Sequence, residues 1–108
     1  MNDDEQQSES FPEIHTFEWD ENKREQNIKK HGIDFDDARI IFDDSFLFRS
    51  SKRGTEARYI VLGFLDTVEV AVICTFREDR CRIISARRAR TNERKELHRR
   101  IKRSGETG

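Results

Sequence analysis

The sequence predicts an α+β domain, in which an antiparallel β-sheet carries two N-terminal helices on one face and a C-terminal helix. Its 108 residues leave room for one domain. Strand-like and helix-like patterns follow one another in the order strand, two helices, four strands, helix. Only 33% of the residues are hydrophobic and 40% are charged, so we expect a thin core that a bound partner helps to stabilise.

The chain is expected to begin with a disordered acidic extension over residues 1–14, where low hydrophobicity combines with charge of one sign. The folded domain is predicted to span residues 15–103, with a flexible tail at 104–108. Its first element is a short strand at 15–19, where apolar and polar side chains alternate.

Two helices are expected next. Asp20 is a good N-cap for a helix over residues 21–31, which Gly32 ends. Asp34 can cap a second helix over residues 35–43, whose apolar residues recur at the spacing of a core-facing stripe.

Four strands and a last helix complete the predicted order. The strands are expected at 46–49, 58–65, 68–76 and 81–89. Thr91 can cap a helix over residues 92–103, in which Leu97 and Ile101 are the apolar residues. So few apolar side chains predict that this helix docks weakly.

The last two strands are expected to form a hairpin with Glu78 and Asp79 as its turn. Counting outward pairs Arg77 with Arg80, Thr75 with Arg82, and Ile73 with Ile84. Three arginines then share one face of the sheet, where like charges repel one another unless an anion lies near.

Both faces of this hairpin carry apolar residues, so we expect both to be covered. One face is predicted to present Val70, Val72 and Ile83, and the other Ile73, Ile84 and Ala86. The paired helices would cover one face, and the last helix or a partner would cover the other.

The remaining global features predict a cytoplasmic protein. Cys74 and Cys81 would be diagonal neighbours about 7–8 Å apart, too far for a disulfide, which indicates reduced thiols. The acidic start is unlike a signal peptide. No apolar stretch approaches the roughly 18 residues that span a bilayer, so no membrane association is expected.

Charge is distributed unevenly along the chain. Residues 1–16 contain five acidic residues and no lysine or arginine, whereas residues 77–103 contain twelve lysines or arginines against four acidic residues. A basic C-terminal third indicates a polyanion or an acidic partner. A solvated charged helix without a ligand would have the same composition.

The first predicted helix carries one candidate phosphate-binding set. Lys23, Asn27, Lys30 and His31 fall within an arc of about 100°. These side chains suit phosphate, and His31 could titrate near neutral pH. A polar stripe that faces solvent and ends at His31 would show the same spacing.

A second candidate set combines arginines with a carboxylate. The expected catalytic residues are Arg58, Arg77, Arg82 and Arg87, with Glu56 or His31 as base, and Arg80 and Arg88 are expected to bind RNA phosphate. Guanidinium groups grip phosphate oxygens in a fork and stabilise the charge of a pentavalent phosphorane. Metal-independent RNA cleavage needs little beyond an aligned 2′-hydroxyl, charge stabilisation and a base. Alternatively, some of these arginines pair with acidic residues of the helices.

No metal and no cofactor are expected. The sequence has no HExxH motif and no CxxC pair, and His15, His31 and His98 are widely separated. It also lacks a glycine-rich phosphate loop, which argues against binding of a nucleoside triphosphate.

Two groups of motifs resemble the BrnT family of toxins. The first group comprises Phe17-Glu18-Trp19-Asp20, Lys23, Asn27, Lys30-His31-Gly32-Ile33, Phe35, Ala38 and Phe42-Asp43. The second comprises Glu56-x-Arg58-Tyr59, Gly63, the run RIISARRA at residues 82–89, and Glu93. Together they cover about residues 17–97, nearly the whole predicted domain.

This resemblance implies a RelE-like fold and an endoribonuclease toxin of a type II toxin–antitoxin system that inhibits translation. It also implies neutralisation by a BrnA-type antitoxin with a ribbon-helix-helix domain, through which the complex would contact operator DNA and repress its own operon. In the last helix this chain has Leu97 where the family often has tyrosine, which puts one contact of the active surface in doubt.

Two other function classes fit the same residues. A non-catalytic RNA- or ribosome-binding module would use the arginines only to position phosphate, and its affinity would fall steeply with salt. An interaction subunit would use the basic last helix to dock an acidic partner. The long acidic start suggests a further hypothesis, in which residues 1–16 lie across the basic face and weaken RNA binding.

Overall fold

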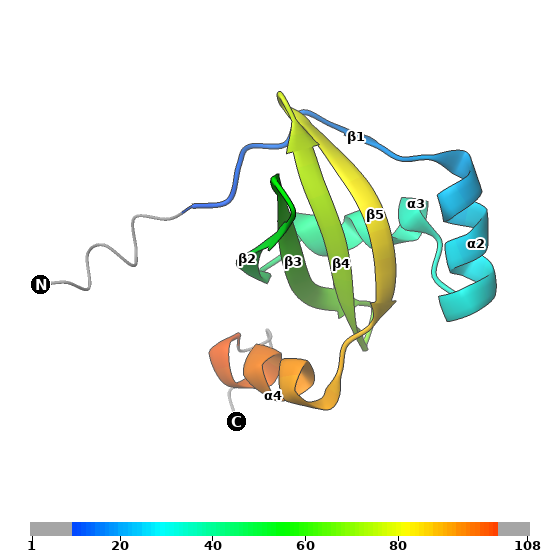
Figure 1. Cartoon of the computed structure of the whole chain (residues 1–108). Helices are drawn as coiled ribbons and strands as arrows, with labels where there is room; N and C mark the ends of the chain where they lie inside the picture. The colour runs from blue at the N-terminus through cyan, green and yellow to red at the C-terminus, as the bar shows by residue number, and fades with distance from the viewer. Residues whose placement is uncertain (1–9, 102–108) are drawn as a thin grey trace, which may run out of the picture.

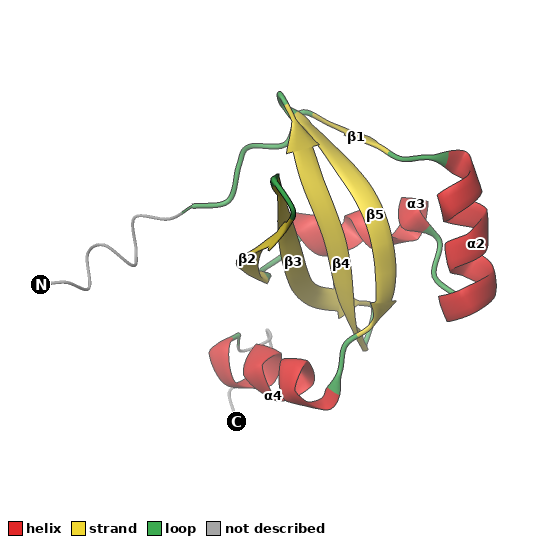
Figure 2. Cartoon of the chain, in the orientation of Figure 1, coloured by secondary structure: helices red, strands yellow, loops and turns green. Residues whose placement is uncertain are grey.

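The computed structural model of the protein describes residues 10–101. It contains a five-stranded sheet in the order β1-β5-β4-β3-β2 (Figures 1 and 2). The strands are β1 (Thr16–Glu18), β2 (Leu47–Arg53), β3 (Glu56–Leu65), β4 (Val68–Arg77) and β5 (Arg80–Arg88). The predicted α+β class is therefore confirmed. Residues 1–9 of the expected extension and the expected tail at 104–108 lie outside the described residues.

The first helix, α2 (Glu21–His31), has the boundaries that the sequence predicts. The Asp20 carboxylate accepts hydrogen bonds from the backbone N–H groups of Asn22 at 2.8 Å and Lys23 at 3.2 Å. Gly32 ends the helix with a φ of 73°, a left-handed conformation that costs glycine little.

The second predicted helix divides into two segments. It begins as α3 (Phe35–Ala38), where the Asp34 side chain accepts the N–H of Asp36 at 2.9 Å, and continues as the 3₁₀ helix η1 (Arg39–Asp43). The tighter winding lies against β3, where a Cβ built on Gly63 would meet the Cβ of Ile41 at 2.9 Å. Only glycine lets η1 approach the sheet this closely.

The prediction of a wholly antiparallel sheet is wrong for one strand. The strands β2, β3, β4 and β5 pair antiparallel in sequence order, but β1 joins the outer edge of β5 in parallel, with Phe17 opposite Cys81. Residues 19–79 separate these two strands, which leaves enough chain for the long connection that parallel pairing requires.

The predicted hairpin register holds near the turn and fails beyond it. Arg77 faces Arg80 and Thr75 faces Arg82, as expected. A β-bulge then adds one residue to β5, so that Ile73 faces Ser85 instead of Ile84. The extra residue reverses which face of the sheet each later side chain of β5 points to. Ala86 therefore lies in the larger cluster with Val72, whereas the sequence predicted that these two residues lie on opposite faces.

The core consists of two clusters, one on each face of the sheet. The larger cluster packs Phe35 of α3 and Ile41 of η1 against residues such as Val61 and Val72. The smaller cluster joins Leu62 and Ala71 of the sheet to Leu97 of the last helix, and it confirms that both faces are covered. Both cysteines are free thiols in the larger cluster, as predicted.

Part of the expected N-terminal extension packs against the larger cluster. The Phe11 ring centroid lies 5.1 Å from those of Phe48 and Tyr59 and 5.2 Å from that of Phe46, with the rings edge to face. Aromatic pairs in this geometry add to the free energy of burial. Apolar packing therefore begins at Phe11, before the first strand.

The last helix, α4 (Thr91–Arg100), begins one residue earlier than predicted. Its N-cap is Arg90 instead of Thr91, and the Glu93 carboxylate accepts the backbone N–H of Arg90 at 2.7 Å. This bond satisfies one of the N–H groups that a helix start leaves unpaired. Leu97 is fully buried against the sheet.

Candidate functional site

Four of the arginines on the sheet face that α3 and η1 leave uncovered lie close together on β3, β4 and β5. Side chains alternate between the two faces of a strand, and Tyr59, Phe76 and Cys81 pack in the larger core cluster. The adjacent positions on β3, β4 and β5 therefore point to the opposite face. We call the resulting set the arginine surface; its members are Arg58, Arg77, Arg80 and Arg82.

Glu18 holds the β5 side of the arginine surface. Its carboxylate accepts a hydrogen bond from Nη1 of Arg82 at 3.2 Å and forms an ion pair with Arg80, whose Nε lies 3.3 Å away. Without the shared carboxylate of Glu18, the like charges of Arg80 and Arg82 would repel one another. Glu18 was not among the site residues predicted from the sequence, because its position depends on the parallel pairing of β1 with β5.

Glu56 and Arg77 complete the opposite side of this surface. The Glu56 carboxylate accepts from Nε and Nη2 of Arg58 at 3.3 and 3.2 Å. Arg77 is exposed and forms no ion pair with any residue between positions 10 and 101. Its charge is the least compensated of the four and therefore the most available to an anion.

Arg87 has a different environment, because both of its terminal nitrogens bind Glu93. The two N–O distances are 2.8 and 3.0 Å, and the side chain of Glu93 is 2% exposed. Arg87 and the backbone N–H of Arg90 lower the pKa of Glu93 to about 2. This buried fork joins β5 to α4, so Arg87 is engaged in holding the helix.

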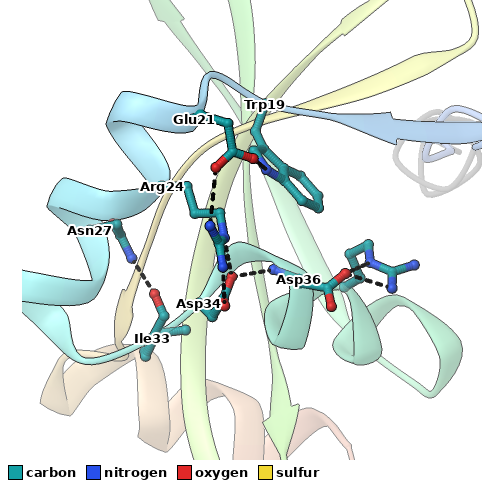
Figure 3. A network of polar contacts seen from close by, with 8 residues as sticks. Trp19, Glu21, Arg24, Asn27, Ile33, Asp34 and Asp36 are labelled. Carbon is teal, nitrogen blue, oxygen red and sulfur yellow. Dashed lines mark hydrogen bonds and ion pairs between the residues drawn. The ribbon is translucent and has the colours of Figure 1, made fainter.

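The candidate set on α2 lies apart from the arginine surface. Asn27 is buried, and its amide donates to the carbonyl of Ile33 at 2.9 Å (Figure 3). The amide also donates to the carbonyl of Ala86 at 2.8 Å, and its oxygen accepts the Ala86 N–H at 3.2 Å. These backbone bonds hold α2 beside β5 on the side of the larger cluster. The other members of the set are exposed or half-buried on the same helix: Lys23, Lys30 and His31.

A separate ionic network fixes the turn between α2 and α3 (Figure 3). Nε and Nη2 of Arg24 bind the two oxygens of Asp34 at 2.8 and 2.9 Å, and Nη1 binds Glu21 at 3.0 Å. Arg24 lowers the pKa of Asp34. All three nitrogens of this guanidinium bind carboxylates, so the network has a structural role.

The structure therefore gathers part of the predicted site and separates the rest. It brings together Glu56, Arg58, Arg77, Arg80 and Arg82. Arg88 is placed elsewhere, because it pairs with Val70, which faces the larger cluster. Arg88 thus lies on the α3 side of the sheet, as the α2 residues do.

A groove runs between α4 and the strands β2 and β3, next to the arginine surface. Its volume is about 590 Å³, within the range of small-molecule sites. Leu47, Ile60 and Leu62 form an apolar floor, and the walls include Arg49 and Lys95. No residue of this groove was predicted as a site residue, since the sequence does not show how the last helix lies on the sheet.

On the other flank of α4, His98 binds Glu69 of β4. The distance between Nε2 of His98 and Oε2 of Glu69 is 2.5 Å, and the hydrogen bond lowers the pKa of Glu69. The His98 ring also packs edge to face on Phe64, with centroids 5.4 Å apart. This contact and the Arg87 fork attach α4 to the sheet at two points.

Within residues 10–101 no group of three potential ligands could hold a metal ion. No helix in the described part of the chain is long and apolar enough to cross a membrane. The site thus consists of arginines, two carboxylates and the adjacent groove.

The sequence model of a family described as "Ribonuclease toxin, BrnT, of type II toxin-antitoxin system" matches residues 19–93. The chain belongs to the BrnT family. No curated protein matches the chain in sequence. The matched range includes the whole arginine surface, from Arg58 to Arg82, and ends at Glu93, the residue that anchors α4.

A solved BrnT structure has the same fold. The chain is 27% identical to the ribonuclease toxin BrnT of Brucella abortus, known from a crystal structure at 1.1 Å resolution, with a TM-score of 0.56. The match covers 72% of this chain and all of that one. The fold is thus similar to that of a ribonuclease toxin over this part of the chain, and the resemblance seen in the sequence motifs is confirmed.

Proposed function

We propose that the protein is a metal-independent endoribonuclease with a RelE-like fold, which cleaves RNA on the arginine surface and thereby inhibits translation in the cytoplasm. The observation that carries this proposal is the gathering of Arg58, Arg77 and Arg82 on one open face, flanked by carboxylates. Such a face combines the charge stabilisation and the proton acceptor that RNA cleavage requires.

The proposed reaction is attack of the ribose 2′-hydroxyl on the adjacent phosphorus. Glu56 accepts the hydroxyl proton, the new P–O2′ bond forms, and the P–O5′ bond breaks to leave a 2′,3′-cyclic phosphate. Water protonates the departing 5′-oxygen. Arg58 and Arg77 bind the phosphate oxygens and stabilise the additional negative charge of the phosphorane, which no metal is then needed to balance.

We further propose an antitoxin partner of the BrnA type, with a ribbon-helix-helix domain that carries any contact with operator DNA. Membership in a type II toxin family supports a protein antitoxin. The low hydrophobic content, 33%, supports the idea that a partner adds to the buried surface.

Cleavage by purified protein in the presence of EDTA tests this proposal. We expect wild-type protein to cut single-stranded RNA and Arg77→Ala to cut it at least about tenfold more slowly, since one phosphate contact of this kind contributes about 1.5–3 kcal/mol. Arg77 forms no described ion pair, so its removal leaves the fold intact. Arg88→Ala, which removes the same charge from the opposite face, serves as the matched control.

Three results decide the matter. Cleavage that EDTA abolishes would contradict the metal-independent route. Equal rates for Arg77→Ala and Arg88→Ala would remove the arginine surface from the reaction. RNA binding without any scission would favour the alternative of a non-catalytic RNA-binding module, in which the arginines only position phosphate.

A further inference from the structure

The groove between α4 and the β2–β3 edge lies beside the arginine surface on the same face of the sheet. Ile60 on its floor and Arg58 on the arginine surface are two residues apart on β3, so their side chains share a face and lie about 7 Å apart along the strand. An RNA strand whose phosphate binds Arg58 would therefore place a neighbouring nucleotide at the mouth of this groove.

The floor of the groove suits a flat apolar ring. Leu62 is buried, and Leu47 and Ile60 are half-buried beneath the opening. A volume of about 590 Å³ accommodates a nucleobase with its ribose. Bases of single-stranded RNA are commonly splayed out and bound in this way, by apolar contact with their faces and hydrogen bonds to their edges.

Arg49 is the best-placed group to bind the edge of such a base. Its side chain is 58% exposed, and its one described ion pair is a 3.4 Å contact with Glu93. Glu93 already accepts two shorter bonds from Arg87 and one from the Arg90 N–H, so the Arg49 guanidinium is weakly held. A guanidinium offers two parallel donors, which match the O6 and N7 acceptors of guanine.

The charges around the opening favour an anionic ligand, such as the phosphate backbone of a nucleic acid. The groove wall carries Lys95, which forms no ion pair with any residue between positions 10 and 101. The carboxylate of Glu96 is already taken up by Arg99 and Arg100. The lining is net cationic, and it lies beside the arginine surface, as expected for the path of one phosphate backbone. Its charged residues are four cations, Arg49, Lys95, Arg99 and Arg100, and two carboxylates, Glu93 and Glu96.

We propose that this groove is a nucleobase subsite, in which Arg49 selects guanine next to the phosphate bound by the arginine surface. The assignment rests on the proposed ribonuclease function and names its base preference. Arg49 is a specificity-determining residue here, whereas Arg58 and Arg77 bind the reacting phosphate.

The test uses DNA oligonucleotides that contain one ribonucleotide, so that each has a single cleavable phosphate. The base on either side of that phosphate is varied through all four types. We expect the full-length protein to cleave fastest where guanine lies on one side, and Arg49→Met to lose about tenfold of this preference, the discrimination that one bidentate contact provides. Lys52→Met, which removes a charge from the same strand on the other face, should keep the preference.

A wild-type protein without guanine preference, or an Arg49→Met variant with unchanged preference, would overturn the subsite and assign the groove to a protein partner or to solvent. Binding of all-deoxy oligonucleotides, which cannot be cleaved, tests the subsite separately from the proposed ribonuclease activity. If nothing is cleaved, guanine-dependent binding that Arg49→Met abolishes still supports the subsite. Equal binding of all four bases by both proteins would refute it.

Discussion

At the scale of single residues, Asn27 shows how a side chain that suits phosphate can serve the fold instead. It bonds three backbone groups of Ile33 and Ala86. We expect Asn27→Ala to lower the free energy of unfolding by about 3 kcal/mol, because each buried polar group left unpaired costs about 1–3 kcal/mol. RNA affinity of the folded fraction should not change. Urea unfolding and an RNA-binding titration measure the two effects.

The control for this prediction is Asn22→Ala, an exposed asparagine in the first turn of the same helix. Its effect on stability should stay within about 0.5 kcal/mol. Weaker RNA binding by Asn27→Ala with unchanged stability would contradict the structural role and restore the phosphate-binding role predicted from the sequence.

At the scale of elements, the attachment of α4 depends on a carboxylate with a strongly lowered pKa. Glu93 has a pKa of about 2 in the folded protein against an ordinary value of 4.5. A lowered pKa means that the folded state binds fewer protons, so this stabilisation is complete above about pH 4.5 and is lost as the pH falls towards 2.

Replacing this carboxylate should therefore change both the stability and its pH dependence. We expect Glu93→Gln to lose about 3 kcal/mol at pH 7, because Arg87 is left in a largely buried site without its counter-ion. Its unfolding free energy should also vary less than that of wild type between pH 4.5 and 2. Urea titrations over this range measure both effects.

Asp34 and Glu69 also have lowered pKa values, so the difference between wild type and variant isolates Glu93. Glu25→Gln, at an exposed position of α2, is the matched control and should follow the wild-type curve. Parallel pH curves for Glu93→Gln and wild type would contradict the assigned coupling to Arg87.

The elements also show what the sequence could reveal and what it could not. The bounds of α2 could be predicted from the sequence, because Asp20 caps the start of the helix and Gly32 ends it through contacts within a few residues. The hairpin turn likewise placed Arg77 opposite Arg80. The bulge at Ile84, the parallel pairing of β1 and the groove beside α4 depend on contacts between distant segments, which no local pattern encodes.

At the scale of the whole molecule, the uneven charge along the chain makes a further prediction. Deleting residues 1–9 removes four acidic residues and changes the formal net charge from −1 to +3. The deletion stops short of Phe11, whose ring packs on the core, so stability should not change. We expect RNA affinity at low ionic strength to rise about three- to tenfold, since a more positive protein attracts a polyanion more strongly.

Varying the salt concentration shows whether residues 1–9 affect RNA affinity through their charge or through steric hindrance. The Debye length falls from about 10 Å at 0.1 M salt to about 3 Å at 1 M, so the difference in affinity should disappear as salt is raised. A full-length variant in which the same four acids become Asn and Gln should match the deletion, because it removes the charge and keeps the chain. If the deletion variant and the wild type bind RNA with equal affinity at low salt, residues 1–9 do not weaken RNA binding. If the deletion variant binds RNA more tightly than the amide variant at every salt concentration, the segment acts through its bulk and not through its charge.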